Sequence, residues 1–245
     1  MERFRQQDKT IYDDGIDDGR VQYAELLSGT YRHVNAAHKL FKDDEDHMLF
    51  FSKENDSNGC VNTVDLTYPE SPLYLAYNPQ LEKGMITSIL EYEYSGRWPY
   101  AFSAHDLGTY PHANGNVYGD PRKNDGSTMP LEENANIITL AAVIAKLDGD
   151  LNYLRKYWDI LTLWTKYLVD YVKDPENQLC TDDFKGFSSR NSNLAVKATM
   201  GIASYAEMCK MLGYKDEYEK HMKIAREFAH YFCDHAKSSN GKYYR

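Results

Sequence analysis

The sequence has few cysteines, no basic run and no long apolar run. Only four of its 245 residues are cysteine, and none forms a C-x-x-C pair, so neither a disulfide framework nor a thiolate metal site is predicted. The longest apolar stretches are far too short to cross a bilayer. The net charge is -9, whereas nucleic-acid binding needs a basic surface. We therefore expect no membrane span and no nucleic-acid partner.

No signal peptide is visible, because the first residues are polar. The composition is otherwise that of a globular domain, with 42% hydrophobic and 27% charged residues. Tyrosine is unusually frequent, at 21 residues against 9 Phe and 3 Trp. Since its ring is apolar and its hydroxyl is polar, this abundance suits either tyrosine-rich helix packing or a wet cleft.

Apolar residues recur at helical spacing through most of the chain. The spacing predicts long helices over residues 21–41, 79–95, 131–147, 152–172, 194–212 and 216–236. Gly149 and Gly213 follow two of these helices, as expected for tight turns. Residues 131–147 are almost wholly apolar and residues 152–172 are amphipathic, which indicates an inner and an outer helix. The prediction is an all-α fold, arranged as an α/α toroid of helical hairpins.

Two segments interrupt the helical pattern. Residues 42–72 are polar and irregular, with short strand-like pieces around Asn58 and Gly59. Residues 96–130 contain five Gly and four Pro, which break any helix. A loop of this length inside a domain is usually functional or disordered, and its aromatic residues argue against disorder. We therefore expect the loop over residues 96–130 to carry function.

Acidic residues recur in the loops and in the first turns of the predicted helices. They are Asp65, Asp106, Glu132, Glu133, Asp182 and Asp183. Asp106 follows His105 in the long loop, and Tyr110 and Asn114 crowd the same segment. This crowding favours a functional role for Asp106 over a simple Asx turn. Asp65 could equally tie down its own loop, and Asp182 with Asp183 could cap a turn.

Glu132 and Glu133 are expected to do different jobs. Glu132 and Asn136 are four residues apart on a helix and therefore share a face. Glu133 points about 100° away from Glu132, since a helix has ~3.6 residues per turn. The alternative is structural, because carboxylates in a first helical turn after Pro130 favour the helix dipole.

The chain offers no clear nucleophile and no metal motif. It contains no G-x-S-x-G, and neither Ser103 nor Cys60 has a paired base in view. The spacing of His105 and His112 fits no standard ligand pattern. We therefore expect no metal and no cofactor, and water activated by carboxylates is the simplest chemistry that this set supports.

Five segments closely resemble the glutaminase A family, and they cover nearly the whole chain from about Val21 onward. They read SKENDSNGCVNTVDLTYPESPLYLAYNP, AHDLGTYPHANGNVYG, MPLEENANIITLAAVIAKLDG, ENQLCTDDFKG and NSNLAVKATMGIASYAEM. That family is described as a six-helical-hairpin domain, similar to (α/α)6 glycosidase toroids. The resemblance implies a hydrolase that converts the glutamine side-chain amide to glutamate and ammonia.

The resemblance also sets expectations about extent and location. It implies a single six-hairpin-type domain over residues 1–245, with a C-terminal closing segment and an upstream β-rich region outside the chain. Contact with those missing segments is expected. It further implies a secreted protein, either periplasmic or extracellular, that acts on a small molecule.

Two other functions stay open on the residues alone. One is a glycoside hydrolase of carbohydrate metabolism, which would use paired carboxylates on an oligosaccharide. The other is a non-catalytic carbohydrate-binding module. In either enzyme, Glu133 is the predicted acid or base, Asp106 its partner and Glu132 a third acidic group. The predicted substrate-binding residues are Asp65, His105, Tyr110, Asn114, Asn136, Asp182 and Asp183.

Overall fold

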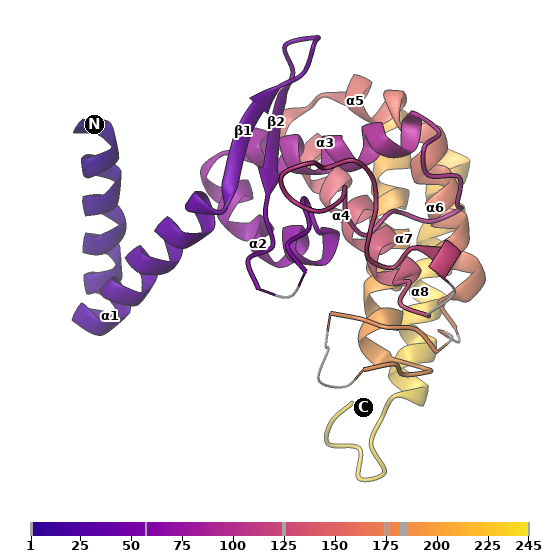
Figure 1. Ribbon diagram of the computed structural model, residues 1–245. Coiled ribbons are helices and arrows are strands. Elements are labelled where there is room, and N and C mark those ends of the chain that lie inside the picture. The colour runs from indigo at the N-terminus through magenta and orange to yellow at the C-terminus, as the bar shows by residue number, and fades with distance from the viewer. Residues whose placement is uncertain are drawn as a thin grey trace. The chain divides into compact units, whose positions relative to one another are not determined.

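Residues 2–36 form one bent helix. The computed structural model describes residues 2–56, 58–123, 126–173, 175, 177–181 and 186–244, and it divides the chain into two units, Met1–Leu40 and Phe41–Arg245 (Figure 1). In the first unit, α1 (Glu2–Ala36) leaves helical geometry at Gly19 and Arg20. Its two arms then run back along each other, and Gln7 Nε2 donates to Tyr31 Oη at 2.9 Å.

The chain changes from helix to strand earlier than the sequence suggested. β1 (His38–Lys42) and β2 (Met48–Ser52) make a two-stranded sheet. The prediction of a helix through Phe41 was therefore wrong over its last turn. The Phe41 ring packs against Phe51 with centroids 5.2 Å apart, and such cross-strand aromatic pairs stabilise a strand over a helix end.

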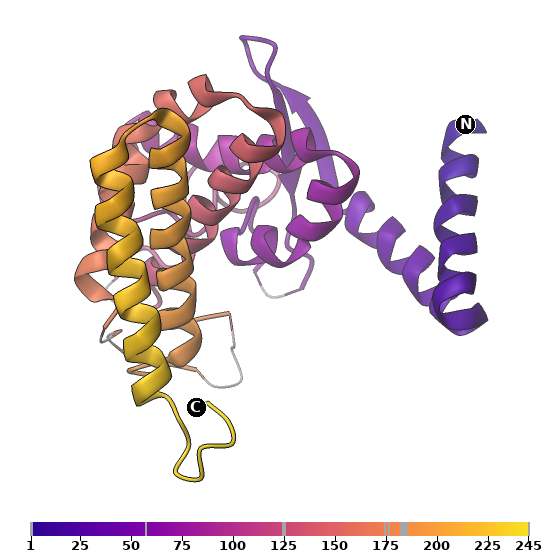
Figure 2. The ribbon, with the colours of Figure 1, turned by 180° about the vertical axis from the view of Figure 1, so that it is seen from behind.

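The second unit is built from helices packed around a central one, which confirms the all-α prediction. They are α2 (Val64–Tyr77), α3 (Pro79–Tyr94), α4 (Pro130–Asp148), α5 (Leu151–Lys156), α6 (Trp158–Tyr171), α7 (Ser192–Leu212) and α8 (Lys215–His235). α4 contacts α2, α3, α6 and α7. α7 and α8 form a long hairpin, seen from behind in Figure 2. Closure into a two-layered toroid stays a prediction.

The central helix, α4, is buried because its sequence is almost wholly apolar after the first turn. Its buried apolar side chains include Leu131, Ile137, Ile138, Leu140 and Ile144. Gly149 follows the last residue of α4 with a φ of 72°, and Gly213 follows the last residue of α7 with a φ of 83°. Both glycines adopt the left-handed conformation that closes a helix, as predicted.

The sequence pattern missed α2, because two prolines lie inside it. Pro72 has no N–H to donate to the carbonyl of Tyr68, and the Ser71 hydroxyl donates to that oxygen instead, at 2.7 Å. This local replacement lets the helix continue past a residue that usually breaks it. The result places Asp65 in a first helical turn rather than in a loop.

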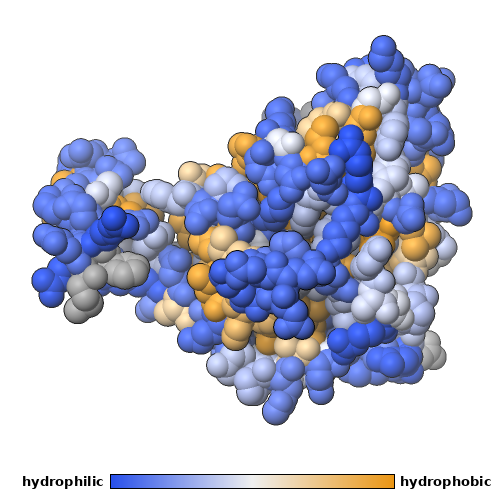
Figure 3. Space-filling model, turned by 90° about the horizontal axis from the view of Figure 1, so that it is seen from above, coloured by the Kyte–Doolittle hydropathy of each residue, from blue (hydrophilic) through white to orange (hydrophobic). Residues whose placement is uncertain are grey.

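The long loop of the prediction is present between α3 and α4, and among its described residues a short 3-10 turn at Pro121–Lys123 interrupts it. Within the part of the chain that is described, no helix combines the length and the apolar character that a bilayer crossing requires. Figure 3 shows one face of the molecule, on which hydrophilic residues predominate and hydrophobic ones appear in separate places.

Candidate active site

The first turns of α2 and α4 meet the long loop, and the backbone fixes this meeting. The N–H of Val64 donates to the carbonyl of His105 at 2.9 Å, so the loop is tied to the start of α2. The loop is also held at Val61, whose carbonyl accepts from the N–H of Leu107 and whose N–H donates to the carbonyl of Gly108. His105 is thereby held beside Asp65, the second residue of α2.

Three buried side chains converge there: Asp65, His105 and Glu133. One potential ligand atom from each lies within 4.8 Å of the other two. His105 Nε2 is 3.6 Å from Asp65 Oδ1. The sequence had predicted Glu133 as an acid or base and the other two as substrate-binding residues, and the structure brings all three into one cluster. We call it the Asp65–His105–Glu133 cluster.

Glu133 is the most isolated carboxyl in this cluster. Its side chain is buried, with 1% of the residue exposed, and neither oxygen has a hydrogen-bond partner among the described residues. Burial raises the pKa of Glu133 well above its usual value, and the charges of Asp65 and Glu132 raise it further. Lys197 and Asn136 act weakly in the other direction. Burial and the two neighbouring carboxylates favour the protonated, neutral form of Glu133 over its charged form.

Glu132 has the opposite environment. It accepts hydrogen bonds from the N–H and Oγ1 of Thr181, at 2.9 and 2.8 Å, and from Lys197 Nζ at 2.5 Å. Asn136, on the same helical face, makes no hydrogen bond to Glu132, because Thr181 and Lys197 supply a charged network that a neutral amide cannot match. The expectation that Glu132 and Glu133 differ in role agrees with this geometry.

Asp106 is fully occupied by its own loop. Its carboxylate accepts four hydrogen bonds, at 2.7 to 3.1 Å, from the backbone N–H groups of Gly108, Val117 and Tyr118 and from His105 Nδ1. The bond to Gly108 is the Asx turn that was the alternative interpretation of this residue. Asp106 was predicted as the partner of Glu133, but the carboxyl that the cluster places beside Glu133 is that of Asp65.

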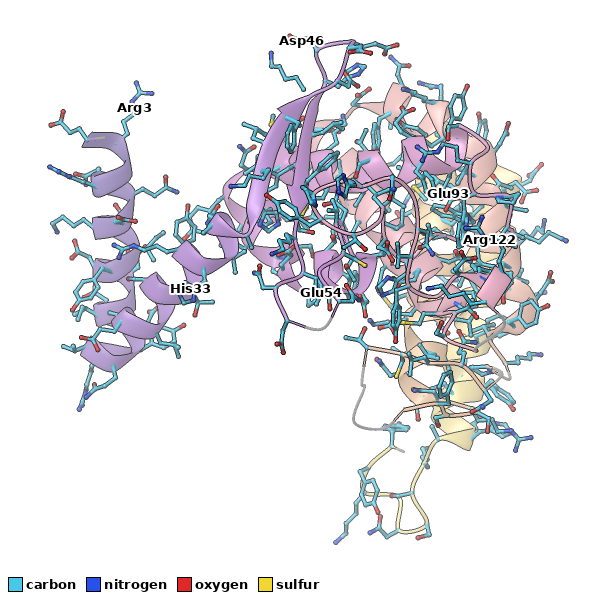
Figure 4. All side chains as sticks on the ribbon, in the orientation of Figure 1. Arg3, His33, Asp46, Glu54, Glu93 and Arg122 are labelled. Carbon is cyan, nitrogen blue, oxygen red and sulfur yellow. The ribbon has the colours of Figure 1, made fainter. Side chains whose placement is uncertain are left out.

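His105 connects the two aspartates. Its Nδ1 faces Asp106 and its Nε2 faces Asp65. Burial by itself lowers the pKa of His105, but the carboxylates of Asp106, Asp65 and Glu54 together raise it above its ordinary value. Glu54, labelled in Figure 4, accepts a hydrogen bond from Thr63 just before α2 begins.

The remaining predicted residues lie in different surroundings. Tyr110 and Asn114 are on the exposed part of the long loop, and Lys53 lies over the Tyr110 ring. Asn136 is buried on α4 beside Glu133. Asp182 and Asp183 lie outside the described residues, so their prediction is not tested.

Sequence reasoning missed three residues that shape the site. Thr181 joins Asp65 to Glu132, Lys197 neutralises Glu132, and the Asn116 side chain accepts from the N–H groups of both His105 and Asp106. Asn116 lies in the recognisable long-loop motif, and that was a usable signal. Lys197 lies far along the chain on α7, where no local pattern distinguishes it from a surface lysine.

Thiol chemistry is disfavoured at this site. Burial, together with the charges of Asp106 and Glu54, raises the pKa of Cys60 to about 12, so its thiolate is scarce at neutral pH. His112, whose spacing from His105 fits no standard metal-ligand pattern, is exposed on the loop.

The chain matches the Glutaminase A six helical-hairpin domain over residues 20–245. It belongs to this family. Glutaminase A of Aspergillus oryzae is 38% identical over 222 residues, which cover 90% of the chain and 31% of that protein. A protein named as a probable glutaminase from Arthroderma benhamiae is 30% identical, over 83% of the chain and 30% of its own length. The chain thus spans about 30% of the length of these two glutaminase A relatives.

Proposed function

We propose that the protein hydrolyses the side-chain amide of glutamine to glutamate and ammonia at the Asp65–His105–Glu133 cluster. The names of the two relatives support glutamine as the substrate. The observation that carries the proposal is Glu133, a buried carboxyl without a hydrogen-bond partner in the described part of the chain. A neutral carboxylic acid beside an ionisable one is the arrangement that general acid–base catalysis requires.

Amide hydrolysis needs one group to take a proton from water and another to give a proton to the leaving nitrogen. Differences in hydrogen bonding and nearby charge assign one of these roles to Asp65 and the other to Glu133. Burial raises the pKa of both, but the oxygens of Glu133 accept no hydrogen bond from the described residues, whereas Thr181 and the charge of His105 lower the pKa of Asp65. Asp65 therefore ionises first and accepts the proton of the attacking water, while Glu133 keeps its proton for the nitrogen.

The protons balance over one turnover. The water oxygen bonds to the amide carbon as one of its protons moves to Asp65. The carbon–nitrogen bond breaks as the Glu133 proton moves to the nitrogen, which leaves as ammonia. Because the two carboxyls lie within 4.8 Å, the proton on Asp65 can return to Glu133 and restore the starting state.

Thr181 connects this pair to Glu132, and Lys197 offsets the charge of Glu132. Thr181 Oγ1 lies 3.1 Å from Asp65 Oδ2 and donates to Glu132 at 2.8 Å. Lys197 holds the charge of Glu132 in an ion pair. Thr181 is exposed, so the cluster lies just beneath the surface, and a substrate amide could approach it from that side.

Glycoside hydrolysis is the second candidate, and one observation favours it. Carboxyl oxygens of Asp65 and Glu133 lie within 4.8 Å, close to the ~5–5.5 Å separation found in retaining glycosidases. An oligosaccharide substrate and a location outside the cytoplasm remain proposals that rest on the family resemblance.

A substrate panel decides between the two. The purified protein is incubated with L-glutamine, L-asparagine and a set of oligosaccharides, and ammonia and reducing sugar are both measured. We expect ammonia and glutamate in equal amounts from glutamine and no new reducing ends. Release of sugar without ammonia would establish the glycosidase instead, and turnover of neither substrate would contradict both.

A further inference from the structure

We infer that Asp65, His105 and Glu133 form a binding site for one divalent transition-metal ion of the Zn²⁺ type. The inference concerns the same cluster as the proposed hydrolysis, but it is a claim about binding and does not depend on that activity. Because a carboxyl group must be ionised to bind a metal, ion binding would release the Glu133 proton that the metal-free route uses, so the bound ion and that route are alternative states of one site. It rests on the donor set, on the spacing of the donor atoms and on how the surroundings leave those atoms available.

The donor set and its spacing fit such an ion. Two carboxylates and one imidazole are ligands that Zn²⁺ and its neighbours accept. Zinc lies ~2.0–2.2 Å from nitrogen and oxygen ligands, so donor atoms around a tetrahedral ion are about 3.4 Å apart. His105 Nε2 and Asp65 Oδ1 are 3.6 Å apart, and all three donors lie within 4.8 Å. The first of these separations is already close to that spacing, and a separation as long as 4.8 Å would have to close by about 1.4 Å for the three donors to share one ion.

The carboxyl donor atoms are buried and accept no hydrogen bond from the described residues. Both oxygens of Glu133 and Oδ1 of Asp65 have no hydrogen bond within the described residues. Buried polar atoms left in this state cost free energy unless a proton, a water or a cation satisfies them. Five carboxyl groups gather here, those of Glu54, Asp65, Asp106, Glu132 and Glu133, and the nearby basic groups are Lys197 and His105. A divalent cation would offset this excess of negative charge.

The loop already orients the imidazole as a ligand. Asp106 accepts from His105 Nδ1 at 3.0 Å, which directs Nε2 toward Asp65 and Glu133. A carboxylate that holds the second nitrogen of a histidine is the usual outer partner of a metal-bound imidazole. Asp106 is itself fixed by three backbone N–H groups, so this orientation is built into the fold.

A second buried glutamate, Glu82, is desolvated in the same way but does not belong to a group of potential metal ligands in the described residues. Both oxygens of Glu82, on α3, also lack a partner among the described residues. The one charge that acts on its pKa is that of Glu70. In the part of the chain that is described, the Asp65–His105–Glu133 cluster is the one group of three potential ligands that converge. Glu82 is therefore a matched control for Glu133.

A bound Zn²⁺ with three protein ligands would keep an open position and lower the pKa of a water held there. The exposed Thr181 beside Asp65 and Glu132 marks the side from which an ion could enter.

The test is a zinc titration of the tag-free protein after treatment with a chelator and desalting. Binding is measured at pH 7.5 by competition with a chromophoric chelator, and thermal unfolding is followed with and without Zn²⁺. The variants are Asp65→Asn, His105→Gln and Glu133→Gln, with Glu82→Gln as the control. We expect the wild type and Glu82→Gln to bind one ion per chain and to gain thermal stability from it.

Each ligand variant should bind Zn²⁺ at least about 10-fold more weakly and gain no thermal stability, since the loss of even an outer partner costs that much. Three variants are used because one may not fold on its own. The inference is overturned if the wild type binds no stoichiometric ion, or if folded ligand variants bind it as the wild type does. Ammonia release by the chelator-treated protein is assayed separately, so failure of the metal site and failure of the proposed function are distinguishable.

Discussion

At the scale of single residues, Glu132 and Glu133 are neighbours in sequence but differ in environment. Glu132 is held by Thr181 and Lys197, whereas Glu133 has no partner in the described part of the chain. Because one helical position separates them by about 100°, only Glu132 can reach the cation on α7. The cost of burying a carboxyl without a partner keeps the proton on Glu133.

Asp106 gives a prediction at the same scale. Asp106→Asn replaces an acceptor oxygen with an NH₂ group that faces N–H donors. We expect the free energy of unfolding to fall by about 1–3 kcal/mol, because a buried donor loses its acceptor. Urea unfolding measures this loss. Asp120→Asn is the control, since Asp120 pairs with the exposed Arg122 in the same loop and should cost less.

The opposite outcome for Asp106 is informative. If Asp106→Asn keeps its stability while turnover on the substrate disappears, then Asp106 takes part in the chemistry directly. That result would restore the prediction of Asp106 as the partner of Glu133 and contradict a purely positioning role.

Glu82 predicts a dependence of stability on pH. Burial, with a contribution from the charge of Glu70, raises the pKa of Glu82 to about 9, above the ordinary 4.5. The folded state then holds a proton that the unfolded chain releases. The stability contribution is therefore complete below pH 4.5 and is lost as the pH rises toward 9, by up to about 1 kcal/mol per pH unit.

We expect Glu82→Gln to reduce this decline by the contribution of Glu82, because the amide has no proton to lose. Glu93, whose pKa burial also raises to about 9, keeps its own contribution. Urea unfolding at pH 5.5 and pH 8 measures the two slopes. Glu219→Gln, at an exposed position of α8, is the control and should keep the slope of the wild type. An equal slope for Glu82→Gln and the wild type would show that Glu82 does not titrate over this range.

At the scale of elements, the contact between α4 and α7 depends on Gly201. A Cβ atom there would lie 2.8 Å from Leu168 Cδ1 and 3.1 Å from the backbone Cα of Ala135. Gly201→Val should therefore lower the free energy of unfolding by about 1–3 kcal/mol through overpacking. Met200→Val, which places the same side chain on the exposed face of α7, is the control. Equal losses in both variants would argue against close packing at Gly201.

The helices that the sequence predicted well are those with long, regular apolar patterns. The helices now labelled α3, α4, α7 and α8 were expected within one or two residues of their observed bounds. α2 was missed because its two prolines normally end a helix, and the rescue by the Ser71 hydroxyl depends on a local geometry that spacing does not reveal. The first strand was missed because its partner lies in another segment.

The candidate site was predictable only in part, for a related reason. Asp65, His105 and Glu133 were all selected from the sequence, because they lie in loops or first helical turns. Which of them meet depends on contacts between segments far apart in the chain, such as the backbone bond from Val64 to His105. Thr181 and Lys197 carried no local signal at all.

At the scale of the whole molecule, the family and the geometry support one account. The chain belongs to the glutaminase A family, carries a net charge of -9 and holds Asp65, Glu132 and Glu133 in the first turns of α2 and α4. The positive ends of those helices favour the carboxylates there. A hydrolase with an acid–base carboxyl pair is the function that this arrangement supports best.

The most direct test of that account is the turnover number of Glu133→Gln on glutamine, measured as ammonia release beside Glu82→Gln. Both variants exchange a buried glutamate without a hydrogen-bond partner in the described residues for an amide, so their effects on folding are comparable. We predict that kcat falls by roughly 10²–10⁴-fold for Glu133→Gln and stays near the wild-type value for Glu82→Gln. Near wild-type turnover by a folded Glu133→Gln would contradict the account.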